Sequence, residues 1–176
     1  MQPPPVPGLV LRRVLWLARF DGLGVLWVAT FFALTTAGIG DITGAGAWLI
    51  LAGAGAIGLH GVGLLRGGQT RGVNWLVGSQ LLFIAVVFVD CGVRLTHYDP
   101  TQLRAALTDE MKTTLVQAKF DPEDFLLLVW RTTYGLIALA TLLYKGGLAL
   151  YFHLRRPAVA DALDAMELEV ETPESE

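Results

Sequence analysis

The stretch from Ala47 to Leu65 contains no aspartate, glutamate, lysine or arginine, and His60 is its only ionisable side chain. A helix needs about 20 mostly apolar residues, each adding about 1.5 Å, to cross a hydrocarbon core of about 30 Å. Three other apolar stretches reach a similar length, at about 22–39, 73–95 and 125–152. The sequence therefore predicts an all-α integral membrane protein, a four-helix bundle that forms a single domain over residues 1–156.

The overall composition agrees with a membrane protein. Hydrophobic residues make up 53 % of the chain and charged residues 16 %, and the mean hydropathy of +0.53 is too high for an ordinary soluble domain. The net charge of −3 comes largely from the acidic segment 157–176 and therefore identifies no partner. The basic residues are too dispersed for a nucleic-acid-binding surface. The single cysteine, Cys91, excludes an intrachain disulfide.

The glycines and alanines of the second stretch predict close helix packing, because small residues let helix backbones approach each other in lipid. At about 100° per residue they form two small faces. One face contains Ala54, Gly58 and Gly61, and the other contains Ala52, Gly53, Ala56 and Gly63. We therefore expect this helix inside the bundle, with Gly53, Ala54, Gly58 and Gly61 as packing residues. The GxGxxG string at 53–58 follows no strand and indicates packing, not dinucleotide binding.

Basic residues predict the orientation, because lysine and arginine concentrate on the cytoplasmic side of a membrane. They cluster before the first span, between the second and third spans, and after the fourth: Arg12, Arg13, Arg19, Arg66, Arg71, Arg155 and Arg156. All three clusters place both termini in the cytoplasm, and the simple topology favours the inner membrane of a bacterium. A cleavable signal peptide is the alternative for the first span. We favour an uncleaved anchor, because the apolar run is longer than a typical signal core.

The longest polar segment, 96–124, predicts an amphipathic extracytoplasmic helix at about 100–119. Asp99 and Pro100 form a typical helix start. Apolar residues then recur every four positions, at Leu103, Leu107, Met111 and Leu115. Pro122 marks the expected start of the fourth span. Pro157 is expected to end that helix, so that residues 157–176 form an acidic, disordered cytoplasmic tail.

Polar side chains within the spans are the functional candidates, because burying them in lipid is costly. They are His60, Gln80, Asp90, Arg94, Arg131 and Lys145. We hypothesise that Asp90 bridges Arg94 and Arg131. The alternative is that each arginine extends separately to the lipid headgroups.

Helix depth predicts two further contacts. His60 and Gln80 lie at the same depth on neighbouring spans, which favours an interhelical hydrogen bond. Asp21 and Lys145 both belong near the inner interface, where they can pair across spans one and four. His60 has no second histidine, cysteine or carboxylate at its depth, so we expect no metal site and no cofactor.

The sequence contains no catalytic or ligand-binding motif. We expect a non-enzymatic structural, accessory or assembly subunit, whose partners are the lipid bilayer and a second copy or another membrane protein. The first alternative is a small channel or transporter subunit that uses the intramembrane polar residues. The second alternative is a membrane enzyme acting on lipid or quinone. Four-span architecture alone does not distinguish these functions.

Overall fold

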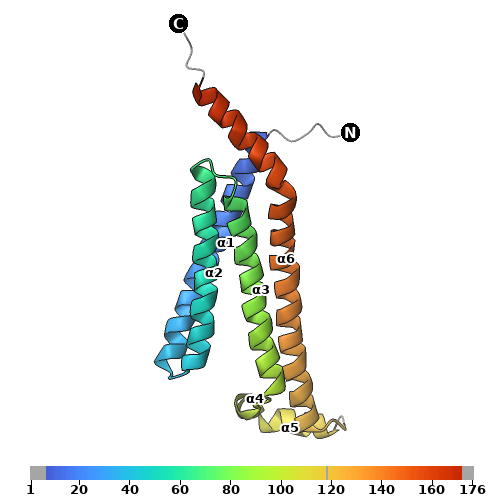
Figure 1. Cartoon of the computed structure of the whole chain (residues 1–176). Helices are drawn as coiled ribbons and strands as arrows, with labels where there is room; N and C mark the ends of the chain where they lie inside the picture. Colours follow the sequence, from blue (N-terminus) through green and yellow to red (C-terminus); the bar gives the residue numbers. More distant parts are fainter. Residues whose placement is uncertain (1–6, 118, 172–176) are drawn as a thin grey trace, which may run out of the picture. The chain divides into compact units, whose positions relative to one another are not determined.

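The computed structural model describes residues 7–117 and 119–171, and all regular structure in these ranges is helical. The helices are α1 (Pro7–Gly38), α2 (Ile42–Arg66), α3 (Gly72–Thr96), α4 (Thr101–Ala106), α5 (Asp109–Gln117) and α6 (Pro122–Glu171) (Figure 1). Four of them, α1, α2, α3 and α6, are long and apolar enough to cross a membrane. The all-α prediction and the four long apolar helices are therefore confirmed.

The described residues form two compact units. The first unit contains residues 7–86 and 144–171, which are α1, α2, the first part of α3 and the last part of α6. The second unit contains residues 87–143 apart from residue 118, and therefore includes the end of α3, α4, α5 and the beginning of α6.

In the first unit, α2 is approached closely by both α1 and α3. A Cβ atom added to Gly55 of α2 would lie 2.9 Å from the backbone oxygen of Gly22 in α1. A Cβ atom added to Gly61 would lie 2.9 Å from the backbone oxygen of Gly72 in α3. Since real Cβ atoms do not approach so closely, glycine is required at both positions. The expectation that two neighbours approach the second apolar helix is confirmed.

Only some of the residues predicted for the two small faces of α2 pack against a neighbouring helix. Ala54, Gly58 and Gly61 are buried, and Gly58 faces the Ser79 hydroxyl of α3. Gly53, in contrast, has open space where a Cβ would lie, and Ala56 is exposed. The residue that contacts α1 is Gly55. A lipid-facing position and a helix-facing position both accept a small residue, so residue size alone does not separate them.

Short turns connect the helices of the first unit. Gly40, between α1 and α2, has a φ of +83°, and Gly68, between α2 and α3, has a φ of +76°. Glycine adopts this left-handed backbone without the steric cost that a side chain would add. Asp41 caps α2, because its carboxylate accepts a hydrogen bond from the Gly44 amide at 2.8 Å. These turns hold α1, α2 and α3 as successive antiparallel neighbours (Figure 1).

The hydrophobic core of the first unit joins all four of its helices. It comprises Val10, Leu11, Val14, Ala18, Val62, Leu65, Val73, Leu76, Leu148, Phe152, Val159, Ala162 and Leu163. The last three follow Pro157, so the expected helix end at this proline is wrong: α6 continues to Glu171. Proline inside a helix costs about 3 kcal/mol. Burial of the following apolar side chains offsets this cost. Residues 172–176 of the expected tail lie outside the described residues.

In the second unit, the expected single helix at about 100–119 is two shorter helices, α4 and α5. Leu107 is extended, with a φ of −75° and a ψ of 108°. The hydroxyl of Thr108 then accepts a hydrogen bond from the Met111 amide at 3.3 Å, which favours a new helix start at Asp109. This local capping outweighs the four-residue apolar repeat. Ala118 lies outside the described residues. Pro122 begins α6 as expected.

Candidate functional site

The first unit contains a buried ion pair between α1 and α6. Asp21 is 7 % exposed and Lys145 is 3 % exposed, and Lys145 Nζ donates to Asp21 Oδ1 at 2.6 Å. The pairing of these two residues, expected from their depth, is therefore confirmed. Asp21 does not lie at the edge of its helix, because α1 begins 14 residues earlier, at Pro7.

Two further side chains donate to the same carboxylate. Gln80 Nε2 in α3 lies 2.9 Å from Asp21 Oδ2. The Tyr144 hydroxyl in α6 lies 3.1 Å from Asp21 Oδ1. Both oxygens of the carboxylate therefore accept hydrogen bonds, and the donors come from two other helices. We call Asp21, Gln80, Tyr144 and Lys145 the carboxylate cluster.

Aromatic rings surround the ammonium group of Lys145. Its Nζ lies 4.6 Å from the centroid of the Phe83 ring and 5.3 Å from that of the Tyr144 ring. A ring face attracts a cation, and this attraction grows where water is excluded. The lysine is thus stabilised by one carboxylate and two aromatic rings, which together offset the cost of removing its charge from water.

The amide of Gln80 has a fixed orientation. A carboxylate only accepts hydrogen bonds, so the nitrogen of the amide must face Asp21. The oxygen, Gln80 Oε1, is buried and accepts no hydrogen bond from the described residues. The neighbouring Ser79 hydroxyl donates to the Leu76 carbonyl at 2.8 Å. The cavity beside these groups measures about 10 Å³, close to the minimum that holds one water molecule.

His60 does not belong to this cluster. Its ring is exposed on α2 and meets the Trp75 ring edge-on, with the ring centroids 5.2 Å apart. The expected hydrogen bond between His60 and Gln80 is therefore wrong. The prediction rested on the equal depth of the two residues in their helices. Gln80, however, faces Asp21 on α1. The Asp21 carboxylate is a charged acceptor, and hydrogen bonds to charged groups are stronger than neutral ones, which favours this rotation of α3.

A second polar group lies in the second unit. Arg94 Nε donates to Asp90 at 3.1 Å from Oδ1 and 2.9 Å from Oδ2, and both side chains are 40 % exposed. The Arg94 guanidinium also lies 5.8 Å from the centroid of the Tyr134 ring. Trp130 Nε1 donates to the Arg94 carbonyl at 3.0 Å. These contacts join the end of α3 to the beginning of α6.

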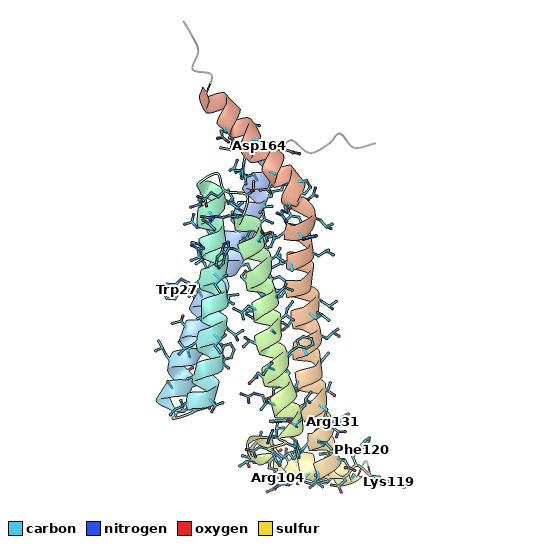
Figure 2. All side chains as sticks on the ribbon, in the orientation of Figure 1. Trp27, Arg104, Lys119, Phe120, Arg131 and Asp164 are labelled. Atoms are coloured by element: carbon cyan, nitrogen blue, oxygen red, sulfur yellow. The ribbon has the colours of Figure 1, made fainter. Side chains whose placement is uncertain are left out.

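Arg131 is not part of that group. Its side chain is exposed, and it forms no salt bridge with any residue in the described part of the chain (Figure 2). The hypothesis that Asp90 bridges Arg94 and Arg131 is therefore wrong for Arg131. Asp90 and Arg94 are four residues apart on one helix, so their pairing needs no contribution from a second helix.

The sequence did not indicate one ion pair between α4 and the first turn of α6. Arg104 of α4 donates to both carboxylate oxygens of Glu123 in α6, at 2.8 Å and 2.7 Å. These hydrogen bonds raise the pKa of Arg104. The two residues are 19 positions apart. All of α5 lies between them in the chain, so no helical spacing could have indicated the pair.

The described residues contain no cluster of three or more histidine, cysteine, aspartate or glutamate side chains that could hold a metal ion. Cys91 is buried and unpaired with another cysteine. Comparison of the chain with protein-family models, curated proteins and solved structures returned no match. The geometry of the two polar groups is therefore the basis for any functional conclusion.

Proposed function

We propose that this chain is a multi-pass protein of the cytoplasmic membrane with both termini in the cytoplasm. The four long apolar helices support membrane insertion. Large apolar side chains on their outer surfaces, such as the outward-projecting Trp27, suit contact with lipid (Figure 2). Support for the orientation comes from the first unit, where Arg12, Arg13 and Arg66 line one groove. The turn at the other end of α1 contains Asp41 and no basic residue.

Within this membrane we propose a non-enzymatic accessory or assembly role, in which the chain binds another membrane protein. The observation that supports this role is the carboxylate cluster. Its two charges neutralise each other, and its hydrogen bonds join α1, α3 and α6. A cavity of about 10 Å³ beside the cluster is too small for a continuous route. The arrangement favours a rigid helix bundle over a conduit.

A channel or transporter subunit is the second candidate. The unpartnered Gln80 Oε1 beside a buried ion pair favours it, because intramembrane ionisable residues often mark ion pathways. Such a function requires the Asp21–Lys145 pair to open during transport. The third expectation, an enzyme acting on lipid or quinone, gains no support from the described side chains.

Two measurements on the full chain separate the candidates. Native mass spectrometry after mild solubilisation should show a stoichiometric complex with a second membrane protein. Liposomes containing the purified chain should be no more permeable to protons, Na⁺ or K⁺ than empty liposomes. A homo-oligomer whose ion flux disappears in folded Lys145→Met protein would contradict the accessory role and establish the transport alternative.

A further inference from the structure

One groove in the first unit is lined by the first part of α1, the end of α2 and two residues of α6. It has a volume of about 1040 Å³, at the upper end of the range for small-molecule sites. Its walls combine apolar and aromatic side chains with several arginines. The apolar wall includes Trp16 and Tyr151, and the basic wall is formed by Arg12, Arg13, Arg19 and Arg66.

The basic wall carries four positive charges. None of the four arginines forms a salt bridge with a residue up to Glu167 whose side chain the structure describes. Acidic residues do occur at the C-terminal part of α6, where Figure 2 labels Asp164. Glu167 lines an adjacent groove with Arg66, and these two residues form no salt bridge with each other. The groove therefore offers guanidinium groups to an external anion.

The arginines of α1 extend from the edge of the hydrocarbon core to just outside the headgroup region. The 32 residues of α1 extend about 48 Å, which exceeds a hydrocarbon core of about 30 Å by about 18 Å. If the core begins near Phe20, Arg19 lies at its edge and Arg13 lies about 9 Å further out. The headgroup region occupies about 5–8 Å on each side. The arginines from 13 to 19 thus span the phosphate level.

We propose that this groove binds an anionic phospholipid, with its phosphate held by the arginines and its acyl chains along the apolar wall. Guanidinium groups recognise phosphate through paired hydrogen bonds. Trp16 is exposed, and an indole at the membrane interface suits contact with the glycerol and upper acyl region. The proposal rests on the membrane placement proposed above, but not on the accessory role.

The chain offers a matched pair of variants for the test. Arg12→Gln/Arg13→Gln removes two charges from the groove. Arg155→Gln/Arg156→Gln removes two charges from exposed positions on α6 that do not line the groove. Each full-length variant is reconstituted into nanodiscs with equal amounts of phosphatidylglycerol and phosphatidylcholine. Native mass spectrometry then measures which lipid remains bound after the nanodisc is removed.

We expect wild type and the Arg155/Arg156 variant to retain phosphatidylglycerol in preference to phosphatidylcholine. In the Arg12/Arg13 variant, the ratio of retained phosphatidylglycerol to phosphatidylcholine should be lower by about tenfold or more. Arg66→Gln, which alters the groove from α2, provides a second variant if the double variant does not fold. Equal retention of the two lipids by wild type, or equal loss in the matched variants, overturns the proposal. Absence of all bound lipid would instead contradict the membrane placement.

Discussion

Asp21 and Lys145 are 124 residues apart in the chain, and Lys145 Nζ lies 2.6 Å from Asp21 Oδ1. This contact joins the first apolar helix to the last. Because both side chains are almost fully buried, neither charge can be solvated by water if its partner is removed. The pair therefore makes the fold of the first unit sensitive to single substitutions.

The Lys145→Met and Asp21→Asn substitutions test this sensitivity. Each should lower the free energy of unfolding by about 3 kcal/mol or more, because one partner remains without its counter-charge. The double variant should lose less than the sum of the two losses. Thermal unfolding in detergent measures all three. Lys112→Met is the control, because its pair with Asp109 is exposed and should change stability by less than about 0.5 kcal/mol. Additive losses would refute the coupling.

Two glycines of α2 provide a second comparison. Gly55→Ala places a Cβ atom 2.9 Å from the backbone oxygen of Gly22, and should destabilise the protein by about 1–3 kcal/mol through overpacking. Gly53→Ala meets open space and should leave stability unchanged or slightly improved. Melting temperatures of the two variants, measured in one detergent, give the result. Equal melting temperatures would mean that α1 and α2 do not approach at Gly55.

The helix beyond Pro157 can be tested with two leucines of α6. Leu163 is 8 % exposed, and Leu163→Ala should cost about 2–5 kcal/mol if it packs in the core. Leu154 is 64 % exposed, and the same substitution there should have little effect. Chemical denaturation compares the pair. A small loss at Leu163 would support the disordered tail that the sequence predicted.

The Asp90–Arg94 pair should contribute less to stability than the carboxylate cluster. Asp90 and Arg94 are 40 % exposed, and such pairs contribute little to stability because solvent or headgroups screen them. Asp90→Asn should therefore cost less than Asp21→Asn in the same unfolding assay. Arg131→Gln should leave stability unchanged, since Arg131 has no ionic partner among the described residues. A large loss in Arg131→Gln would restore the bridging hypothesis.

Low pH should loosen the start of α4. Hydrogen bonds from the Thr101 hydroxyl and amide lower the pKa of Asp99 below its ordinary value. A lowered carboxyl pKa stabilises the turn fully above the unfolded pKa of about 3.9, and this contribution disappears as pH falls through the folded pKa. The protection of the Thr101 amide from exchange, relative to its intrinsic exchange rate at the same pH, should thus fall below about pH 4. Thr101→Ala should raise the Asp99 pKa, measured by carboxyl NMR. An unchanged pKa would exclude the hydroxyl contact.

The sequence predicted properties that depend on position along a helix. The four apolar helices and the pairing of Asp21 with Lys145 follow from length and depth, which the order of residues specifies directly. The rotation of each helix about its own axis could not be predicted from the sequence in the same way. It decides that Gln80 faces Asp21, not His60, and that Gly55, not Gly53, contacts α1. These choices depend on which neighbouring helix approaches each side.

Tertiary contacts also changed the predicted helix ends. Pro157 is a strong local signal for termination, but Val159 and Leu163 belong to the core and extend α6 beyond it. In the polar segment 96–124, the helices are shorter than predicted. A regular apolar repeat predicted one helix, and the extended backbone at Leu107 divides it into two. Local patterns gave the type of structure in both cases, whereas burial and capping determined its length.

The long separation between Asp21 and Lys145 also sets an order during synthesis. At about 5–20 residues per second, Lys145 leaves the ribosome roughly 6–25 s after Asp21, and Gln80 roughly 3–12 s after it. Gln80 is therefore the first residue of the cluster available to the Asp21 carboxylate during translation. The counter-charge arrives only with the final apolar helix. A chain released before residue 145 would therefore carry a buried Asp21 whose counter-charge is missing.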